Sequence, residues 1–430
     1  MMKKYILICL TFLFVVGVQA QIPGAKQTQS ILLKNGFLHI GNGKTIAKSY
    51  IAFDEGIITM AKDMLTNTID ESVYDTVIDL KGQHVYPGFI NLNNTLGITE
   101  IDAVRSTRDF SEVGLFKPNV RSQIAFNTES VVMSTVRTNG VLITQPTPRR
   151  GFISGTSSIM NLDGWNWEDA TLKQDDGVHL NWAWMDENHS DANKHLKRYE
   201  RNLITLESYF SKALSFYSSN KKDETNLQML AMEGIFDGSK RLYIHADKVK
   251  QLLDVLSFVK KYKIKHPVIV GGAESVQVAE ELKSMEIPVL LNRVHSLPNY
   301  EDSPIDEAFV LPKQLQDAGV LFGIQNHGEM EAMNSRNLPF NAGTARSYGL
   351  TNEQAISAVT LNNAQIVGID HLVGSVEKGK QATLFVSKGD ALDQLTNQVN
   401  FAFIQGRILD LDNHQKRLYR KYSKKLGISN

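Results

Sequence analysis

The stretch Val85–Ile101, VYPGFINLNNTLGITEI, decides how this sequence is organised. Pro87-Gly88 ends one apolar segment, and a second apolar run begins directly after it. The alternation in this second run predicts a β-strand, because successive side chains of a strand point to opposite faces. One face of that strand carries Asn91, Asn93 and Thr95. We therefore expect a strand with a polar face where a small opening domain meets the main domain.

The first twenty residues have the composition of a secretory signal. Lys3-Lys4 precedes the apolar run Tyr5–Val18, which is too short to span a bilayer, and Ala20 is a small residue at the expected cleavage point. We expect cleavage before Gln21 and export to the periplasm or the extracellular space. A retained membrane anchor is the alternative. After cleavage, we expect no integral membrane segment.

Composition excludes several classes of function. The only cysteine, Cys9, lies inside the predicted signal, which excludes thiol catalysis, disulfides and cysteine-bound zinc in the mature chain. Cleavage also removes two of the 46 basic residues against 46 acidic ones, so no basic field favours nucleic acid. With 42% apolar residues, the chain can bury a large core. The oligomeric state stays open, and a homo-oligomer is one of the options.

The residues between the predicted signal and the first quoted stretch have the pattern of a small all-β domain. Short apolar runs are separated by turn pairs such as Asn35-Gly36 and Glu55-Gly56. The expected strands contain residues 31–33, 37–40, 50–53, 57–58 and 77–80. Near the other end of the chain, the glycine-rich segment Gly374–Leu384 predicts a turn that leads into a strand at residues 383–386.

Between these two segments, strand-like and helix-like patterns alternate, which predicts an α/β fold. The expected strands are residues 140–145, 242–245, 268–270, 289–291 and 320–325. The expected helices are residues 200–219, 249–262, 275–285 and 352–359, with Ser275 and Asn352 as N-caps. A basic helix is expected at residues 415–425. From this pattern alone, a barrel and a doubly wound sheet both remain open.

Three of these segments resemble the amidohydrolase superfamily, and specifically its imidazolonepropionase-like branch. Pro87–Ile90 is similar to the start of the branch motif P-G-[LF]-I-D-x-H-x-H, and Gly374–Leu384 is similar to G-S-[IL]-E-x-G-K-x-A-D-L. His245-Ala246-Asp247 resembles the end of the fifth barrel strand. The resemblance implies a distorted (β/α)8 TIM barrel over residues 87–370. It also implies a β-sandwich built from residues 21–86 and 371–430, after a signal at 1–20.

The resemblance further implies a catalytic metal, usually zinc, whose bound water attacks a cyclic amide. The two histidines of the first-strand motif are replaced here by Asn93 and Thr95. His245 stands at the fifth-strand histidine, and His327 stands within one residue of the eighth-strand aspartate. The sixth-strand position offers no ligand, and Glu274 either faces the pocket or begins a helix.

Two functions therefore remain open. One is an exported hydrolase of non-peptide C–N bonds in small cyclic amides, with a rebuilt metal centre and His245 and His327 as catalytic and metal-binding candidates. The other is a catalytically inactive homologue that binds a small ligand or a protein partner, because amide and hydroxyl groups are poor zinc ligands. The polar residues expected to line its pocket are Asn91, Asn93, Thr95, Glu274, Gln325 and Asn326.

Three weaker features each have two interpretations. The segment Ser154–Ser158 reads as a loop that could supply a serine nucleophile for His245, although no G-x-S-x-G motif surrounds it. The charged residues 101–120 are either a lid over the barrel or a solvated loop. The four tryptophans either line an aromatic pocket or pack in the core; they are Trp165, Trp167, Trp182 and Trp184.

Overall fold

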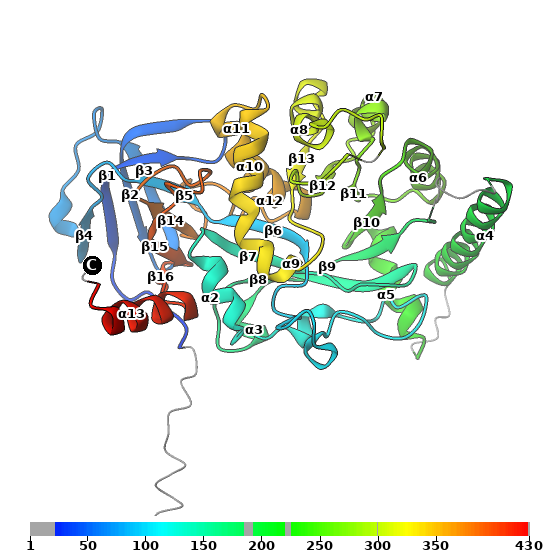
Figure 1. Ribbon diagram of the computed structural model, residues 1–430, viewed down its shortest axis with the longest axis horizontal. Coiled ribbons are helices and arrows are strands. Elements are labelled where there is room, and N and C mark those ends of the chain that lie inside the picture. The colour runs from blue at the N-terminus through cyan, green and yellow to red at the C-terminus, as the bar shows by residue number, and fades with distance from the viewer. Residues whose placement is uncertain (1–21, 185–191, 220–224, 299, 429–430) are drawn as a thin grey trace, which may run out of the picture.

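A computed structural model describes residues 22–184, 192–219, 225–298 and 300–428 of the chain (Figure 1). The predicted signal, residues 1–20, lies outside the described residues. Among the helices of the described part, none combines the length and the apolar character that a membrane span requires.

The larger part of the molecule is an eight-stranded, barrel-shaped sheet that confirms the expected fold class (Figure 1). Its strands follow one another in chain order, and all neighbours are parallel except that β8 runs antiparallel to β7 and β9. They are β6 (Phe89–Asn94), β7 (Val141–Pro146), β8 (Ile153–Asn161), β9 (Thr171–Asn181), β10 (Arg241–Ala246), β11 (Pro267–Gly271), β12 (Val289–Leu291) and β13 (Phe322–Ile324). Parallel barrels place functional groups at the carboxyl ends of their strands.

One asparagine bridges the two end strands of this sheet. Asn363 donates from Nδ2 to the carbonyl oxygens of Ile90 in β6, at 2.8 Å, and Ile324 in β13, at 3.1 Å. A Cβ atom at Gly323 would lie 1.8 Å from Asn363 Oδ1, so only glycine fits at that position. A buried side chain therefore takes the place of strand pairing between β6 and β13.

Helices surround the barrel because their apolar residues recur at helical spacing. In α6, the buried residues Leu252, Val255, Leu256 and Val259 form one stripe against the sheet. The helices are α2 (Val131–Arg137), α3 (Trp167–Ala170), α4 (Ala192–Tyr217), α5 (Leu227–Asp237), α6 (Val249–Tyr262), α7 (Ala279–Ser284), α8 (Glu307–Ala318), α9 (Glu331–Asn334), α10 (Leu338–Ser347), α11 (Asn352–Ala358), α12 (Leu361–Val367) and α13 (His414–Leu426). Short 3-10 turns are η1 (Glu71–Val73), η2 (Arg105–Thr107), η3 (Ser122–Ala125), η4 (Ser275–Val278) and η5 (Ser335–Asn337).

The second sheet joins strands from both ends of the chain. Hydrogen bonds connect its eight strands into one continuous sheet, in the order β16-β15-β14-β5-β1-β2-β3, with β4 paired to β1. The strands are β1 (Ile31–His39), β2 (Thr45–Asp54), β3 (Ile57–Asp63), β4 (Thr76–Asp79), β5 (His84–Pro87), β14 (Leu384–Ser387), β15 (Val399–Ile404) and β16 (Arg407–Ile408). This sheet has a core of its own, to which Leu33, Phe53 and Phe403 contribute. Because β5 leads directly into β6, the sheet anchors the start of the barrel.

Three local predictions need correction. Ser154–Ser158 lies within the buried strand β8, so it is not a loop. The N-cap of α11 is Thr351, one residue earlier than expected, because Thr351 and Gln354 form a reciprocal capping box. The predicted helix at 275–285 starts as a 3-10 turn whose N-cap is Glu274, and the Ser275 hydroxyl caps nothing.

Candidate functional site

The end of β6 departs from the regular alternation expected from the sequence. Asn93 adopts a left-handed backbone conformation, with φ of 48°, which asparagine tolerates better than most residues. The β6–β7 register shifts between Asn91 and Asn94, and Asn93 N–H donates to Gln145 Oε1 at 3.0 Å. The resulting bulge redirects the Asn93 side chain, so Asn91, Asn93 and Thr95 do not continue one regular strand face.

Arg149, in the loop after β7, binds Asn93 through two hydrogen bonds. Its Nη1 donates to Asn93 Oδ1 at 2.6 Å, and its Nη2 donates to the Asn93 carbonyl oxygen at 2.9 Å. The Arg149 side chain is only 14% exposed. A guanidinium therefore occupies the surroundings of the residue that replaces the first histidine of the family motif.

Glu331 supplies the countercharge from the start of α9. Its carboxylate accepts hydrogen bonds from Arg149 Nε and Nη2 at 2.9 to 3.1 Å, and from His327 Nδ1. Burial would raise the pKa of Glu331, but the charges and hydrogen bonds of Arg149 and His327 outweigh it and lower the pKa to about 2. The carboxylate is therefore held ionised in the barrel mouth.

These residues do not fit the zinc ion that the family resemblance implies. Asn93 Oδ1 and both Glu331 oxygens are engaged by the Arg149 cation, and His327 Nδ1 is engaged by Glu331. A divalent cation at the same place would be repelled by the guanidinium at short range. Within the four described ranges of the chain, no group of three or more His, Cys, Asp or Glu side chains is arranged to hold a metal ion.

A chain of amides extends from Arg149 along the barrel mouth. Because a guanidinium has donors only, Asn93 Oδ1 must accept, and Asn93 Nδ2 donates to Gln325 Oε1 at 2.7 Å. Gln325 Nε2 in turn donates to Asn292 Oδ1 at 3.1 Å. The Arg149 cation therefore fixes the orientation of all three amides and leaves Asn292 Nδ2 as a donor at the end of the chain.

His245, half-buried at the end of β10, belongs to a second chain of polar groups, whose other members are buried. Its Nε2 lies 3.0 Å from His179 Nδ1, and His179 Nε2 lies 3.0 Å from Ser157 Oγ. Ser157 donates to Asp176 Oδ1 at 2.7 Å, so it must accept from His179. His245 therefore donates through Nε2, and its Nδ1 carries the lone pair.

The second chain is neutral at its histidine end. Burial lowers the pKa values of His179 and His245 well below their usual range, and the nearby positive charge of Arg149 adds to this. Burial also raises the pKa of Asp176, although hydrogen bonds from Tyr243 and Ser157 oppose that rise. The hydroxyl of Ser157 is fully buried and bonded to both neighbours, so it is not placed as a nucleophile.

The other expected pocket residues form hydrogen bonds outside these chains or are only buried beside the strand end. Asn91 is buried and donates to Ser335 Oγ at 2.8 Å, and Thr95 is buried just beyond β6. Asn326 is buried and accepts from Asn341 Nδ2 at 3.1 Å. Glu274 accepts from the Val249 N–H at 2.7 Å, which places its carboxylate at the start of α6.

The loop at residues 101–120 and the four tryptophans lie in several different environments. Most of the loop is exposed, and its Phe110 carbonyl accepts from the Arg149 N–H at 2.6 Å. Trp182 is buried and donates to Tyr199 Oη at 3.0 Å, whereas Trp165 and Trp184 are about 70% exposed. The tryptophans therefore have separate environments.

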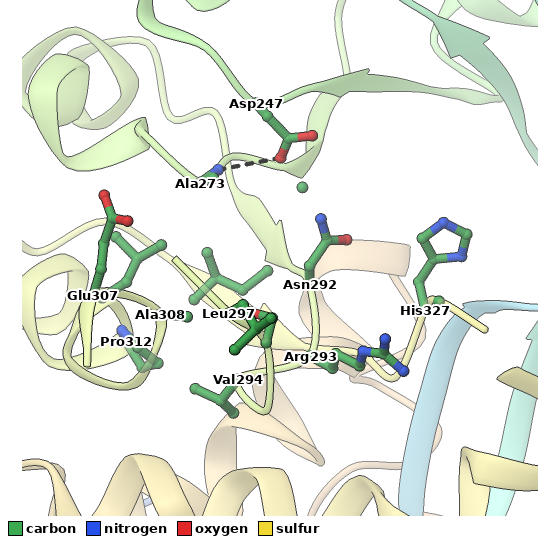
Figure 2. A pocket seen from close by; sticks show the side chains of 15 residues that line it. Asp247, Ala273, Asn292, Arg293, Val294, Leu297, Glu307, Ala308, Pro312 and His327 are labelled. Atoms are coloured by element: carbon green, nitrogen blue, oxygen red, sulfur yellow. Dashed lines mark hydrogen bonds between the residues drawn. The ribbon is translucent and has the colours of Figure 1, made fainter. Parts of the chain in front are cut away.

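A cavity of about 250 Å³ opens beside this polar centre, at the carboxyl ends of β10 to β13 (Figure 2). His327 is shared between the cavity wall and the Arg149–Glu331 pair. The ionisable lining residues are Asp247, Arg293, Glu307 and His327, and the apolar ones include Leu291, Val294, Leu297, Leu311 and Pro312. This position is the usual place for a ligand in a barrel of this type.

Sequence reasoning missed Arg149, Glu331 and His179. Arg149 and Glu331 follow the carboxyl ends of β7 and β13, and His179 lies inside β9 near its carboxyl end, which is a detectable signal once the strands are known. His179 was hidden because β9 was not predicted. Glu331 lies four residues after His327, the spacing of paired side chains on a helix.

The arrangement of the barrel and of the second sheet is shared with solved amidohydrolase structures. The model of the amidohydrolase family matches residues 217–409, and no curated protein matches the sequence. The resemblance to the amidohydrolase superfamily is therefore confirmed over these residues, whereas the imidazolonepropionase-like branch stays a prediction.

Solved structures with the same fold include an amidohydrolase from Thermotoga maritima MSB8. It has 20% identity and a TM-score of 0.73, over 88% of this chain and 99% of that one. An adenosine deaminase from Xanthomonas campestris with bound zinc has 14% identity and a TM-score of 0.52, over 93% of this chain and 99% of that one. A molinate hydrolase has 14% identity and a TM-score of 0.52, over 91% and 96%. At these identities, the likeness establishes the fold.

Proposed function

We propose that this protein is an exported member of the amidohydrolase scaffold that binds a small ligand without metal-dependent hydrolysis. One observation carries the proposal: the Arg149 guanidinium is hydrogen-bonded to Asn93, where the family has a metal-binding histidine, and paired with Glu331. The internal cation neutralises the carboxylate that a metal would otherwise require. The cavity beside it supports a role in binding.

The residues of the site then have structural and binding roles. Arg149 and Glu331 hold the mouth of the barrel together, and the amide chain ends at Asn292 on the cavity wall. His245 is fixed as a neutral imidazole with an acceptor at Nδ1. Export rests on the signal-like residues 1–20.

The competing function is hydrolysis of small cyclic amides at a rebuilt metal centre. A hydrolysis assay with hydantoin, dihydrouracil and ε-caprolactam, with and without added zinc or manganese, separates the two. We expect rates equal to those of the buffer blank for the wild-type protein and for His245→Ala. Turnover that depends on added metal and is lost in His245→Ala would overturn the proposal, because it would require a working metal centre at His245.

A further inference from the structure

The cavity beside the polar centre contains an arginine that the described part of the chain leaves without a partner. Arg293 follows β12, is half-buried and lines the cavity; none of the described residues forms an ion pair or hydrogen bond with its guanidinium. A partly buried cation without a countercharge is costly, and five N–H donors remain available to an incoming anion. Carboxylates match the planar fork of a guanidinium best.

Gly328 keeps this guanidinium in place. Its φ is 140°, and a Cβ atom there would lie 2.7 Å from Arg293 Cζ. Any other residue would therefore displace the arginine head group. The residue after His327 thus leaves room for the cation at the cavity wall.

A second donor comes from the amide chain that Arg149 orients. Asn292 Oδ1 is occupied by Gln325 Nε2 at 3.1 Å, so Asn292 presents its Nδ2 donor, and Asn292 also lines the cavity. Figure 2 shows its amide directed into the cavity between Asp247 and Arg293. Two neighbouring residues of the wall therefore offer a charged donor and a neutral donor to an anionic group.

The remainder of the cavity wall contains two acidic residues, opposite in charge to Arg293, and a group of apolar residues. Figure 2 shows Asp247 and Glu307 on sides of the cavity away from Arg293. Asp247 Oδ1 accepts one weak bond from the Ala273 N–H at 3.3 Å, which leaves acceptor capacity. Leu291, Val294, Leu297, Ala308, Leu311 and Pro312 form the apolar part of the lining.

We propose that this cavity binds a small zwitterion in which an apolar chain separates a carboxylate from an amine. The carboxylate binds Arg293 and Asn292 Nδ2, and the amine binds Asp247. A second carboxylate on the ligand is disfavoured by Asp247 and Glu307. A volume of about 250 Å³ is below the range of roughly 300–1,000 Å³ typical of pockets for drug-sized ligands, so the ligand is short. Hydrolysis of a lactam, in which water adds as the ring C–N bond breaks, yields a molecule of this class.

Calorimetric titration of the full mature protein tests this inference with matched probes. The zwitterions are 4-aminobutanoate, 6-aminohexanoate and 8-aminooctanoate; hexanoate lacks the amine, 6-aminohexanamide lacks the carboxylate, and adipate carries two carboxylates. We expect at least one zwitterion to bind at millimolar concentration or below. Its single-charge analogues and the corresponding diacid should bind at least about tenfold more weakly, since each loses a charge-assisted hydrogen bond.

Three variants assign the contacts. Arg293→Met should weaken the zwitterion about tenfold or more and leave its amide unchanged. Gly328→Ala should give the same pattern with the charge retained, which separates a displaced guanidinium from a lost positive charge. Asp247→Asn should abolish the preference over the analogue without an amine. Exposed Arg336, replaced by Met, is the matched control and should bind as the wild type does.

The assignment of this cavity rests on the proposed function as a binding protein, but different results would overturn the assignment and the proposed function. Absence of binding by every zwitterion, or equal binding of acid and amide, overturns the assignment of the cavity and leaves the metal-free centre untouched. Metal-dependent turnover of a cyclic amide overturns the proposed function, whereas this cavity would still be assigned by the variant pattern.

Discussion

Replacing Arg149 by methionine should destabilise the protein by about 3 kcal/mol at pH 7. The pKa of Glu331 is about 2 instead of 4.5, and one pKa unit corresponds to 1.36 kcal/mol, so Arg149 and His327 together, net of burial, stabilise the ionised carboxylate by about 3 kcal/mol, with Arg149 as the largest stabilising contribution. Methionine keeps the length of the side chain and removes the charge. Removing one partner of a buried ion pair usually costs roughly 3–5 kcal/mol, because the other charge remains buried, and the two figures agree.

Urea unfolding at pH 7, followed by tryptophan fluorescence, measures this loss. Arg420→Met is the matched control: Arg420 also pairs with a carboxylate, that of Asp412, but its side chain is 55% exposed, and no measurable change is expected. Adding Glu331→Gln to the Arg149 variant should recover part of the loss, because the unpaired charge is removed. A loss below about 1 kcal/mol, typical of exposed pairs, would refute the view that Arg149 and Glu331 form the core of the site.

Three further predictions concern the same centre and the barrel that holds it. Because the pKa of Glu331 is lowered in the folded state, its contribution to the free energy of unfolding is present above about pH 4.5 and is lost as the pH falls towards about 2. The difference in stability between the wild type and Glu331→Gln should therefore shrink over this interval in an acid titration. A difference that stays constant with pH would contradict this. Asn363→Ala should cost roughly 1–3 kcal/mol in urea unfolding, since it leaves the carbonyls of Ile90 and Ile324 without their bridge, whereas Asn362→Ala, which loses one bond to the Phe322 carbonyl, should cost less. His179→Phe removes the acceptor that fixes the His245 tautomer. The ¹⁵N resonances of His245 should then move from those of an Nε2–H imidazole towards those of a tautomer mixture. Unchanged resonances would show that His179 does not set the tautomer of His245.

The elements with strong periodicity could be predicted from the sequence. Helix α6 begins and ends at the expected residues, Val249 and Tyr262, because its apolar stripe is regular and long. Strand β12 also has its expected bounds, 289–291. Strands β8 and β9 were missed because serines, a glycine and charged residues interrupt the apolar pattern. Their backbones are nevertheless held in the sheet by pairing with each other and with neighbouring strands.

The polar end of the first barrel strand could be predicted from the sequence, but its contacts could not. The sequence correctly placed a buried polar strand end at Asn93 and left open how its missing histidine is replaced. The replacement depends on Arg149, 56 residues later, and on Glu331, 182 residues after Arg149. Such pairing over long sequence distances has no local pattern. It follows only from the closure of the barrel, which brings the ends of β6, β7 and β13 together.

In the proposed function, the Arg149 guanidinium occupies the place of the family's metal ion, and no metal is bound there. Metal content by mass spectrometry tests it most directly, on mature protein purified without chelators from cells supplied with zinc and manganese. We predict far less than one ion per chain, unchanged in His245→Ala and His327→Ala. One or two ions per chain, lost in either of these variants, would contradict the claim, because His245 and His327 would then be metal ligands.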